Sequence, residues 1–189
     1  MAFVRLFVAV PISPALVEGI SGILAKVSKH RGIRWVLKAQ LHITLRFIGT
    51  FEESQVPKLE QVLGEVSITG EPFEAELGGL GAFPRLDRPR VLFIPVIRGE
   101  EGFRRLEAKM TPALEGLGIK PDEKEYHPHL TLGRVRENEN PRQAVEALQE
   151  ACRAHWEPWK VDRFILFKSQ LAPGGSVYTR LKEFEFGKG

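Results

Sequence analysis

The segment Leu41-His42-Ile43-Thr44-Leu45-Arg46-Phe47-Ile48 decides the fold, because its central motif returns in Tyr126-His127-Pro128-His129-Leu130-Thr131-Leu132. Residues 42–45 and 129–132 both read His-x-Thr-x with aliphatic residues at the x positions, and they lie 87 residues apart. The apolar segments 6–10 and 92–96 match at an offset of 86 residues. A nearly constant offset indicates one strand–helix–strand–helix–strand–strand unit that occurs twice.

Apolar periodicity predicts helices and strands in mixed order along the chain. Strands are expected at 4–10, 33–36, 41–48, 72–82, 90–97, 126–132, 158–170 and 176–186. Helices are expected at 14–29, 54–66 and 101–117, and from Asn140-Pro141 onward, where a capping residue precedes proline as in Ser13-Pro14. Turns are expected at Phe83 to Pro89 and at Pro173-Gly174-Gly175.

Length and composition are those of a globular chain with a modest positive charge. The 189 residues carry a formal net charge of +3 and have a pI near 9.1, which permits an anionic substrate without requiring one. No apolar run approaches the ~18 residues that a membrane span needs. The apolar run 6–10 is too short for an export signal, and Cys152 has no partner for an internal disulfide. We therefore expect a cytoplasmic protein.

Strand geometry sorts the motif residues onto two faces, because successive side chains alternate along a strand. The residues expected on the accessible face are His42, Thr44, Arg46, His129 and Thr131. The residues expected in the core are Ile43, Leu45, Phe47, Leu130 and Leu132. If a pseudo-twofold axis relates the two halves, the two His/Thr pairs face each other across one cleft.

Two histidines that flank one point suit an in-line displacement at phosphorus. A neutral imidazole accepts a proton from water while a protonated imidazole donates one to the departing oxygen, and each transfer contributes roughly 10²–10⁴ in rate. The hydroxyls of Thr44 and Thr131 can donate hydrogen bonds to phosphoryl oxygens, and nothing in this scheme requires a metal. Alternatively, each His and Thr is an ordinary surface residue. The double occurrence of the motif favours an active site.

The paired motifs resemble the two signatures of the 2H phosphoesterases. Within that superfamily the chain is similar to the bacterial and archaeal RNA 2′,3′-cyclic phosphodiesterases, long called 2′-5′ RNA ligases. The resemblance covers essentially the whole chain. Its supporting segments are Arg5-Leu6-Phe7-Val8-Ala9, Leu41 to Gly49, His127 to Arg134 and Val177-Tyr178.

This resemblance implies a fold and a reaction. The fold is α+β and bilobal, a single domain over residues 1–189 in which two pseudo-twofold-related lobes, each with an antiparallel sheet and flanking helices, enclose the active-site cleft. The reaction is hydrolysis of an RNA 2′,3′-cyclic phosphate end to a 2′-phosphomonoester, without metal or cofactor. By family convention His42 is the proton donor and His129 the proton acceptor, although the residues alone do not order them. Thr44 and Thr131 are expected to bind substrate.

Arg134 is implied as a further phosphate-binding residue. Strict alternation places it on the face of Leu130 and Leu132, away from the histidines. Gly133 can host a β-bulge that redirects it toward them. The alternative is a solvated ion-pair partner. Arg46 shares the face of the histidine by alternation, but the resemblance assigns it no role.

Other residues permit alternative interpretations. His127 and His129 could hold zinc from one face of a strand, but no carboxylate or thiol stands at a ligand-like spacing nearby, so the metal-free site is favoured. The tryptophans that could stack on a base, although a core position is expected for each, are Trp35, Trp156 and Trp159. The arginines that could steer RNA or simply be solvated are Arg85, Arg88 and Arg90.

The residues leave alternative functions open. Joining RNA halves through a 2′-5′ bond, or acting on another cyclic nucleotide, would use the same side chains as hydrolysis. A module that binds an RNA end without turnover is a further alternative, although binding alone needs no pair of titratable groups. We expect a monomer that acts on RNA with a 2′,3′-cyclic phosphate end, with tRNA fragments as candidate substrates and no membrane or metal partner.

Overall fold

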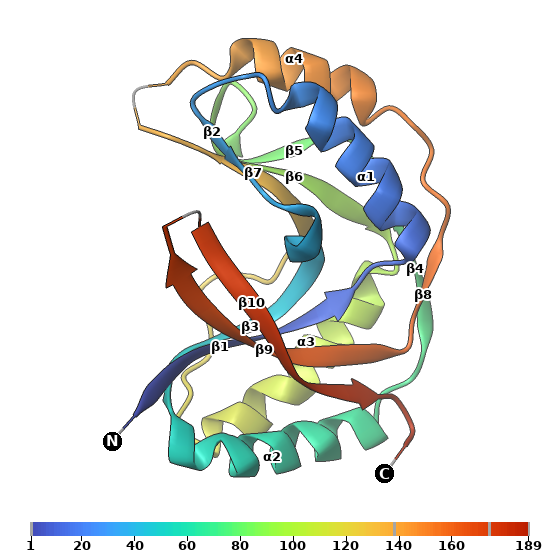
Figure 1. Cartoon of the computed structure of the whole chain (residues 1–189). Coiled ribbons are helices and arrows are strands. Elements are labelled where there is room, and N and C mark those ends of the chain that lie inside the picture. The colour runs from blue at the N-terminus through green and yellow to red at the C-terminus, as the bar shows by residue number, and fades with distance from the viewer. Residues whose placement is uncertain (1, 138, 174, 189) are drawn as a thin grey trace.

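The computed structural model describes residues 2–137, 139–173 and 175–188, and within them the chain is α+β as expected (Figure 1). The strands are β1 (Phe3–Pro11), β2 (Ile33–Trp35), β3 (His42–Glu52), β4 (Phe73–Leu77), β5 (Gly81–Arg85), β6 (Arg88–Arg98), β7 (His129–Val135), β8 (Trp159–Val161), β9 (Arg163–Ala172) and β10 (Gly175–Glu185). The α-helices are α1 (Pro14–Val27), α2 (Val56–Ile68), α3 (Glu100–Glu115) and α4 (Arg142–Ala151). Short 3-10 turns are η1 (Lys38–Gln40) and η2 (Glu53–Gln55).

The strands form one curled sheet in which the paired neighbours run antiparallel. Its order is β10-β9-β1-β3-β7-β6-β4-β8, with β2 paired to β7 and β5 paired to β6. The strand order on the two sides of the β3–β7 contact matches. On one side β1 pairs with β3 and β9 pairs with β1, and on the other side β6 pairs with β7 and β5 pairs with β6. The contact between β3 and β7 is narrow, because the two strands pair through Ile43 and Leu130. The two parts of the sheet therefore diverge on both sides of this point.

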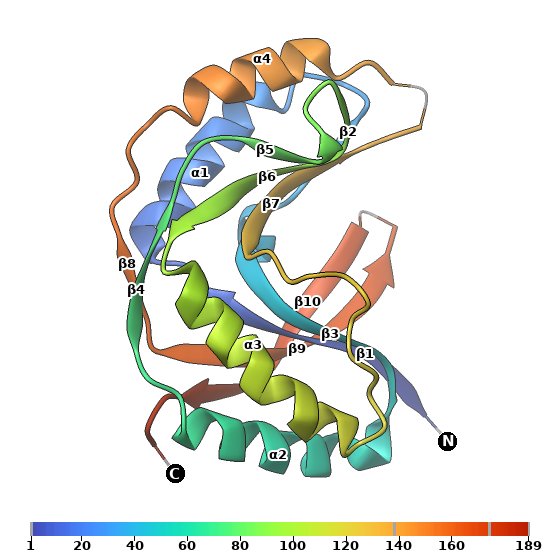
Figure 2. The same cartoon turned by 180° about the vertical axis from the view of Figure 1, so that it is seen from behind.

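The helices divide the molecule into two lobes that do not coincide with the two halves of the sequence. Helix α1 packs against α4, and α2 packs against α3. Figures 1 and 2 show α2 and α3 with β1, β3, β9 and β10, which we call the first lobe, and α1 and α4 with β2, β5, β6 and β7, which we call the second lobe. Each lobe thus combines elements from both sequence halves.

Helix α1 shows why the sequence forms these elements. The Ser13 hydroxyl accepts a hydrogen bond from the Leu16 N–H at 3.3 Å, and proline follows at the first helical position. Leu16, Ile20 and Leu24 then turn one face inward and are buried. Burying each such side chain contributes roughly 1.5–3 kcal/mol relative to leaving it exposed. The core formed in this way is continuous through both lobes, so the lobes share one hydrophobic interior.

Several expected boundaries are wrong, and backbone chemistry explains them. The strand expected at 126–132 begins only at His129, because Pro128 has no N–H to donate to a neighbouring strand. The segment 72–82 is divided into β4 and β5 around Gly79, whose φ is 73°. The segment 158–170 is divided into β8 and β9 at Asp162, whose carbonyl accepts from the Phe186 N–H.

The start of α4 and the expected turns also differ in detail. Pro141 occupies the N-cap position and not the first helical position, and the Asn140 side chain accepts from the Arg142 N–H at 3.1 Å. The turn expected over Phe83 to Pro89 is much tighter, because β5 ends at Arg85 and β6 starts at Arg88. The expected turn at Pro173-Gly174-Gly175 includes Gly174, which lies outside the described residues. No helix within the described ranges is long and apolar enough to span a membrane.

Candidate active site

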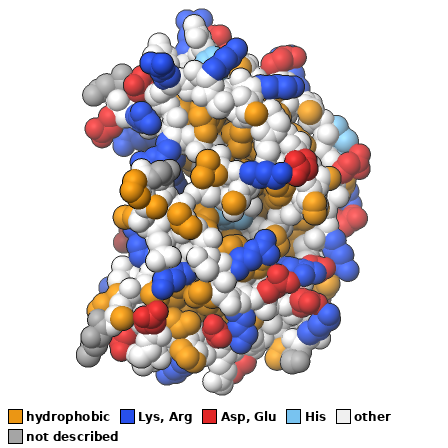
Figure 3. Space-filling model, viewed as in Figure 1, with side chains coloured by type: hydrophobic (Ala, Val, Ile, Leu, Met, Phe, Trp, Pro, Cys, Tyr) orange, Lys and Arg blue, Asp and Glu red, His pale blue; other side chains and the backbone are white. Residues whose placement is uncertain are grey.

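The crossing of β3 and β7 brings the two His-x-Thr-x motifs together. Ile43 and Leu130 pair there and are fully buried, as expected for the core face. His42 precedes this pair on β3 and His129 precedes it on β7, and the two histidines are near enough for the charge of His129 to act on the pKa of His42. The two histidines and two threonines are all half-buried and share the opposite face. Figure 3 shows histidine near the middle of this view of the surface, among hydrophobic and basic side chains.

His42 is held against a wall of aromatic rings from the first lobe. Its Nε2 lies 3.1 Å from the Thr44 hydroxyl oxygen. Its ring centroid is 5.1 Å from that of Phe7, 6.1 Å from that of Phe167 and 5.6 Å from that of Tyr178. These rings come from β1, β9 and β10, which pair side by side. The wall limits the access of water to the imidazole.

His129 has an equivalent aromatic wall in the second lobe. Its ring centroid is 4.9 Å from that of Phe93 on β6 and 5.1 Å from that of Phe83 on β5. The offset from Phe7 to Phe93 is again 86 residues, so this aromatic position belongs to the repeat. The Nδ1 atom lies 2.6 Å from the His127 carbonyl oxygen and donates to it, because a carbonyl can only accept. The Nε2 atom is thereby left as the acceptor of the neutral ring.

Burial lowers the pKa of both histidines. For His42 burial is the main cause and lowers the pKa to about 4, a hydrogen bond with the Gln40 backbone opposes the shift, and His129 adds to it. For His129 burial again lowers the pKa, the hydrogen bond to His127 opposes the shift, and the charge of Arg134 adds to it. Both imidazoles are therefore neutral in the free protein at neutral pH. An anion bound between them would raise both pKa values, since an opposite charge favours the protonated form.

A β-bulge in β3 overturns the expected facing of Arg46 and Phe47. In the pairing with β1, Ala9 faces Thr44 and Val8 faces Arg46, so Leu45 is an extra residue. One extra residue reverses which face the following side chains take. As a result Arg46 is 1% exposed in the core, whereas Phe47 is 60% exposed. The expectation from simple alternation was wrong for both residues.

The same bulge occurs in β7 and redirects Arg134. In the pairing with β6, Phe93 faces Thr131 and Leu92 faces Gly133, so Leu132 is the extra residue. Arg134 is consequently exposed beyond the bulge, and its positive charge acts on the pKa of His129. Its side chain therefore shares the face of the histidine, as expected, although the extra residue of the bulge is Leu132 and not Gly133.

Two residues with no role expected from the sequence hold the site in place. The buried Arg46 guanidinium donates to a Glu107 carboxylate oxygen at 3.0 Å and to the Lys120 carbonyl at 2.6 Å. The Tyr126 hydroxyl donates to the Thr44 carbonyl at 2.9 Å, and burial followed by the charge of Glu107 raises the pKa of that hydroxyl. These contacts fasten the loop 116–128, which leads into β7, against β3. A polar or aromatic residue beside a motif is too common a pattern for this role to be read from the sequence.

The side chains of the remaining candidates face solvent or pack in or against the core. His127 is exposed, and its Nε2 lies 3.8 Å from a carboxylate oxygen of Glu125. No group of three or more potential metal ligands occurs in the described part of the chain. Trp156 and Trp159 are buried, as expected of core tryptophans, and the half-buried Trp35 donates to the His30 carbonyl at 3.3 Å. The Cys152 thiol is buried, which raises its pKa to about 11. Of the turn arginines, Arg85 is paired with Asp87 at 2.7 Å.

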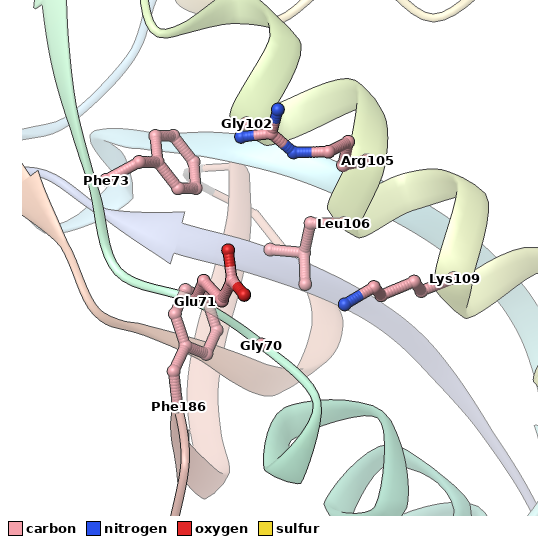
Figure 4. Close-up of a pocket in the computed structure, with 8 residues that line it drawn as sticks. All are labelled: Gly70, Glu71, Phe73, Gly102, Arg105, Leu106, Lys109 and Phe186. Atoms are coloured by element: carbon pink, nitrogen blue, oxygen red, sulfur yellow. The ribbon is translucent and has the colours of Figure 1, made fainter.

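A separate hollow of about 250 Å³ lies between the end of α2, α3 and the C-terminal segment (Figure 4). Phe73, Leu106 and Phe186 form its apolar part, with Arg105 and Lys109 on α3 at its edge. None of the residues that line it is a histidine, and none belongs to β3 or β7. The chemistry of the paired histidines therefore belongs to the β3–β7 junction and not to this hollow.

The fold and the paired histidines together define a protein of the two-histidine phosphoesterase class. The family described as the 2′-5′ RNA ligase superfamily matches residues 10–172. The chain belongs to this superfamily, which confirms the resemblance found in the motifs.

Relatives and solved structures agree with this membership. The chain is 37% identical over 182 residues to an Archaeoglobus fulgidus RNA 2′,3′-cyclic phosphodiesterase, covering 96% of this chain and 99% of that protein. It is 33% identical to a Thermus thermophilus protein of the same name, covering 96% and 88%. The crystal structure of TT0787 from Thermus thermophilus matches with a TM-score of 0.80 at 30% identity, covering 97% and 98%. Escherichia coli LigT complexed with 3′-AMP has the same fold, with a TM-score of 0.78 at 24% identity, covering 99% and 100%.

Proposed function

We propose that this protein hydrolyses RNA 2′,3′-cyclic phosphate ends to 2′-phosphomonoesters. One observation carries the proposal: β3 and β7 cross at Ile43 and Leu130, so that two histidines, each with a threonine two residues on, share one half-buried face. The names of the relatives support the same substrate, since several are called RNA 2′,3′-cyclic phosphodiesterase. A pair of positioned imidazoles is the arrangement that acid–base catalysis at phosphorus needs.

In this proposal His129 is the base and His42 the acid. Because the Nδ1–H of His129 is engaged by the His127 carbonyl, its Nε2 is free to accept a proton from the attacking water. The water oxygen bonds to phosphorus, the bond from phosphorus to the 3′-oxygen breaks, and that oxygen takes a proton from His42. The product carries a 2′-phosphate and a free 3′-hydroxyl. Binding of the anionic substrate raises the pKa of His42, so His42 takes up a proton at that point. It then donates this proton to the departing 3′-oxygen.

The threonines and Arg134 act on the phosphoryl group in this proposal. The Thr44 hydroxyl already lies 3.1 Å from His42 Nε2, so a phosphate that contacts one group is within reach of the other. Thr131 occupies the equivalent position in the second motif. Hydroxyl and guanidinium donors aimed at oxygens that gain charge stabilise the transition state. The proton transfers use the protein's own side chains, so we propose that neither a metal nor a cofactor takes part and that activity persists in EDTA.

We also propose the setting in which the enzyme works. All the groups invoked come from one chain, which supports a monomer. The lone cysteine is buried and unpaired within the described residues, which is in keeping with the cytoplasm. RNA fragments that end in a cyclic phosphate, tRNA fragments among them, are the proposed substrates.

The decisive experiment is incubation with an RNA that ends in a 2′,3′-cyclic phosphate, followed by identification of the end that forms. We expect a 2′-phosphate from the wild type, and a rate roughly 10²–10⁴-fold lower from His42→Ala and from His129→Ala, because each removes one proton transfer. Binding of the RNA should persist in both variants. A 3′-phosphate product, or full activity in either variant, would contradict the proposal. Product joined to an added 5′-hydroxyl RNA would identify a ligase, and binding without turnover would identify an RNA-end-binding module.

A further inference from the structure

The residue two positions before each motif histidine forms a backbone hydrogen bond with the imidazole. In the second motif the His127 carbonyl accepts from His129 Nδ1 at 2.6 Å. In the first motif the Gln40 backbone bonds His42, and because Thr44 engages the Nε2 atom of that ring, Nδ1 is the nitrogen left for this contact. The tautomer of both neutral rings is therefore set in the same way, with Nε2 left to exchange a proton with substrate.

The side-chain amide of Gln40 fastens this part of the backbone at both of its polar ends. Its Oε1 accepts from the Leu37 N–H at 2.8 Å, which closes the 3-10 turn η1. Its Nε2 donates to the Ser176 carbonyl on β10 at 2.5 Å. The Gln40 side chain is half-buried, so little of the amide is left for water to compete for. The turn that leads into His42 is thereby fixed to strand β10 of the sheet.

The same strand supplies part of the aromatic wall of His42. Tyr178 follows Ser176 by two residues on β10, and its ring centroid lies 5.6 Å from that of His42. The Tyr178 ring is itself 4.8 Å from the ring of Phe7 on β1, centroid to centroid. Strand β10 therefore acts on the imidazole twice, directly through the tyrosine and indirectly through the Gln40 amide. An error of about 1 Å in the position of a catalytic group can cost about 10²-fold in rate, so such a support bears on catalysis.

We propose that Gln40 is a positioning residue for His42, and that its side-chain amide holds the carbonyl which orients the imidazole for proton donation. This inference rests on the proposed function, in which His42 protonates the departing 3′-oxygen. At the offset of 87 residues the counterpart of Gln40 is His127, whose side chain is exposed and lies near Glu125. The link to β10 through an amide thus belongs to the acid and has a different counterpart at the base.

The test compares two substrates that differ in the leaving atom. One is an adenylyl dinucleotide that ends in a 2′,3′-cyclic phosphate, and the other is the same dinucleotide with sulfur in place of the terminal 3′-oxygen. A thiol ionises far more readily than an alcohol, with a pKa of about 8.5 in cysteine, so the sulfur departs without a proton from an acid. Loss of the acid should therefore slow the oxygen substrate and largely spare the sulfur substrate.

Gln40→Met removes both hydrogen bonds of the amide and keeps the length of the side chain. It should lower kcat for the oxygen substrate about tenfold with KM within about twofold of wild type, because the acid is displaced while the binding groups remain. Its kcat for the sulfur substrate should fall by less than about twofold. His42→Ala should show the same preference for sulfur, with a larger loss on the oxygen substrate.

Gln61→Met is the matched control, because Gln61 is exposed on α2 and its amide donates to Glu65 at 3.2 Å. It should leave both substrates unaffected. If Gln40→Met loses equally on both substrates, or on neither, while His42→Ala prefers sulfur, the role of Gln40 is overturned and the proposed function stands. An equal loss on both substrates in His42→Ala would overturn the acid role of His42, and this inference with it.

The nitrogen chemical shifts of the His42 ring test the inference without turnover. In the wild type they should report a proton on Nδ1 at neutral pH. In Gln40→Met they should report a mixture of the two neutral tautomers, because the carbonyl is no longer held in place. A single, unchanged tautomer in the variant would also overturn the positioning role.

Discussion

The imidazole of His42 illustrates how single residues acquire their chemistry from packing. Its identity and its strand position follow from the sequence, but its low pKa arises because β1, β9 and β10 surround it with aromatic rings. The chemistry of His129 also depends on packing, because the His127 carbonyl accepts from its Nδ1–H and so sets the tautomer of the neutral ring. A histidine that is neutral when free and protonated when an anion binds couples substrate binding to acid catalysis.

The buried state of His42 predicts how stability depends on pH. Its pKa of about 4 in the folded protein lies below the ordinary value of 6.5 that it regains on unfolding. The unfolded chain then binds more protons, so the free energy of unfolding should fall as the pH is lowered from about 6.5 toward 4. Urea denaturation at pH 7 and pH 5 measures this loss.

His42→Gln provides the comparison, because glutamine is polar but does not titrate. The variant should lose less stability than the wild type between the two pH values. Since the pKa of His129 is also lowered, part of the wild-type loss should remain in the variant. An identical loss in both proteins would show that His42 does not carry the effect.

At the scale of the elements, matching β-bulges in β3 and β7 decide which residues after the motifs are exposed. Each bulge follows a motif threonine by one residue, so two consecutive residues enter the core and the next becomes exposed. Alternation predicted correctly which face each motif side chain takes as far as Thr44 and Thr131. It failed at Arg46 and Phe47, because a bulge depends on the register with the partner strand, which periodicity within one strand does not contain.

Gly133 is required at the second bulge because β2 lies close above it. A β-carbon there would lie 2.7 Å from the Ile33 Cγ2 atom and 3.0 Å from Trp35 Cε3. Gly133→Ala should therefore displace β2 and lower the free energy of unfolding by about 1–3 kcal/mol. Urea denaturation measures this change.

Gly22 is the matched control for this prediction. It lies in α1, and nothing stands within 4 Å of an added β-carbon. Gly22→Ala should raise the free energy of unfolding by about 0.5–1 kcal/mol, because alanine favours a helix. If Gly133→Ala is as stable as the wild type, the close approach of β2 does not constrain this position.

At the scale of the whole molecule, one site is assembled from two lobes that each draw on both sequence halves. The repeat predicted matching motifs and matching flanking strands, and the strand order around the β3–β7 contact agrees with it. That the unit was duplicated stays a prediction. The packing of α1 on α4 and of α2 on α3 could not be read from the repeat, since an offset orders elements along the chain and not in space.

Arg46 joins parts of the molecule that are distant in sequence, and its removal should weaken them together. Its guanidinium binds Glu107 on α3 and the carbonyl of Lys120 in the loop 116–128. Arg46→Met should lower the free energy of unfolding by about 2–3 kcal/mol. The expected loss of stability is smaller than for a fully buried ion pair, because the Glu107 side chain remains 19% exposed. Urea denaturation again measures the change.

Arg85→Met is the matched control, because the ion pair of Arg85 with Asp87 is exposed on both sides. Such pairs contribute less than about 1 kcal/mol, so this variant should stay close to wild type. If Arg46→Met costs no more than Arg85→Met, the buried network does not hold the loop against β3.

The sequence by itself determined the class of fold, the repeated motif and the two histidines that face a common surface, because these follow from periodicity and residue chemistry along single elements. Only the tertiary structure decided which face Arg46, Phe47 and Arg134 take, how far burial lowers the histidine pKa values, and that the Gln40 side chain reaches β10. Each of these depends on register and packing between strands that are distant in the chain. The physical reason is that desolvation and cross-strand contacts exist only after the sheet has formed.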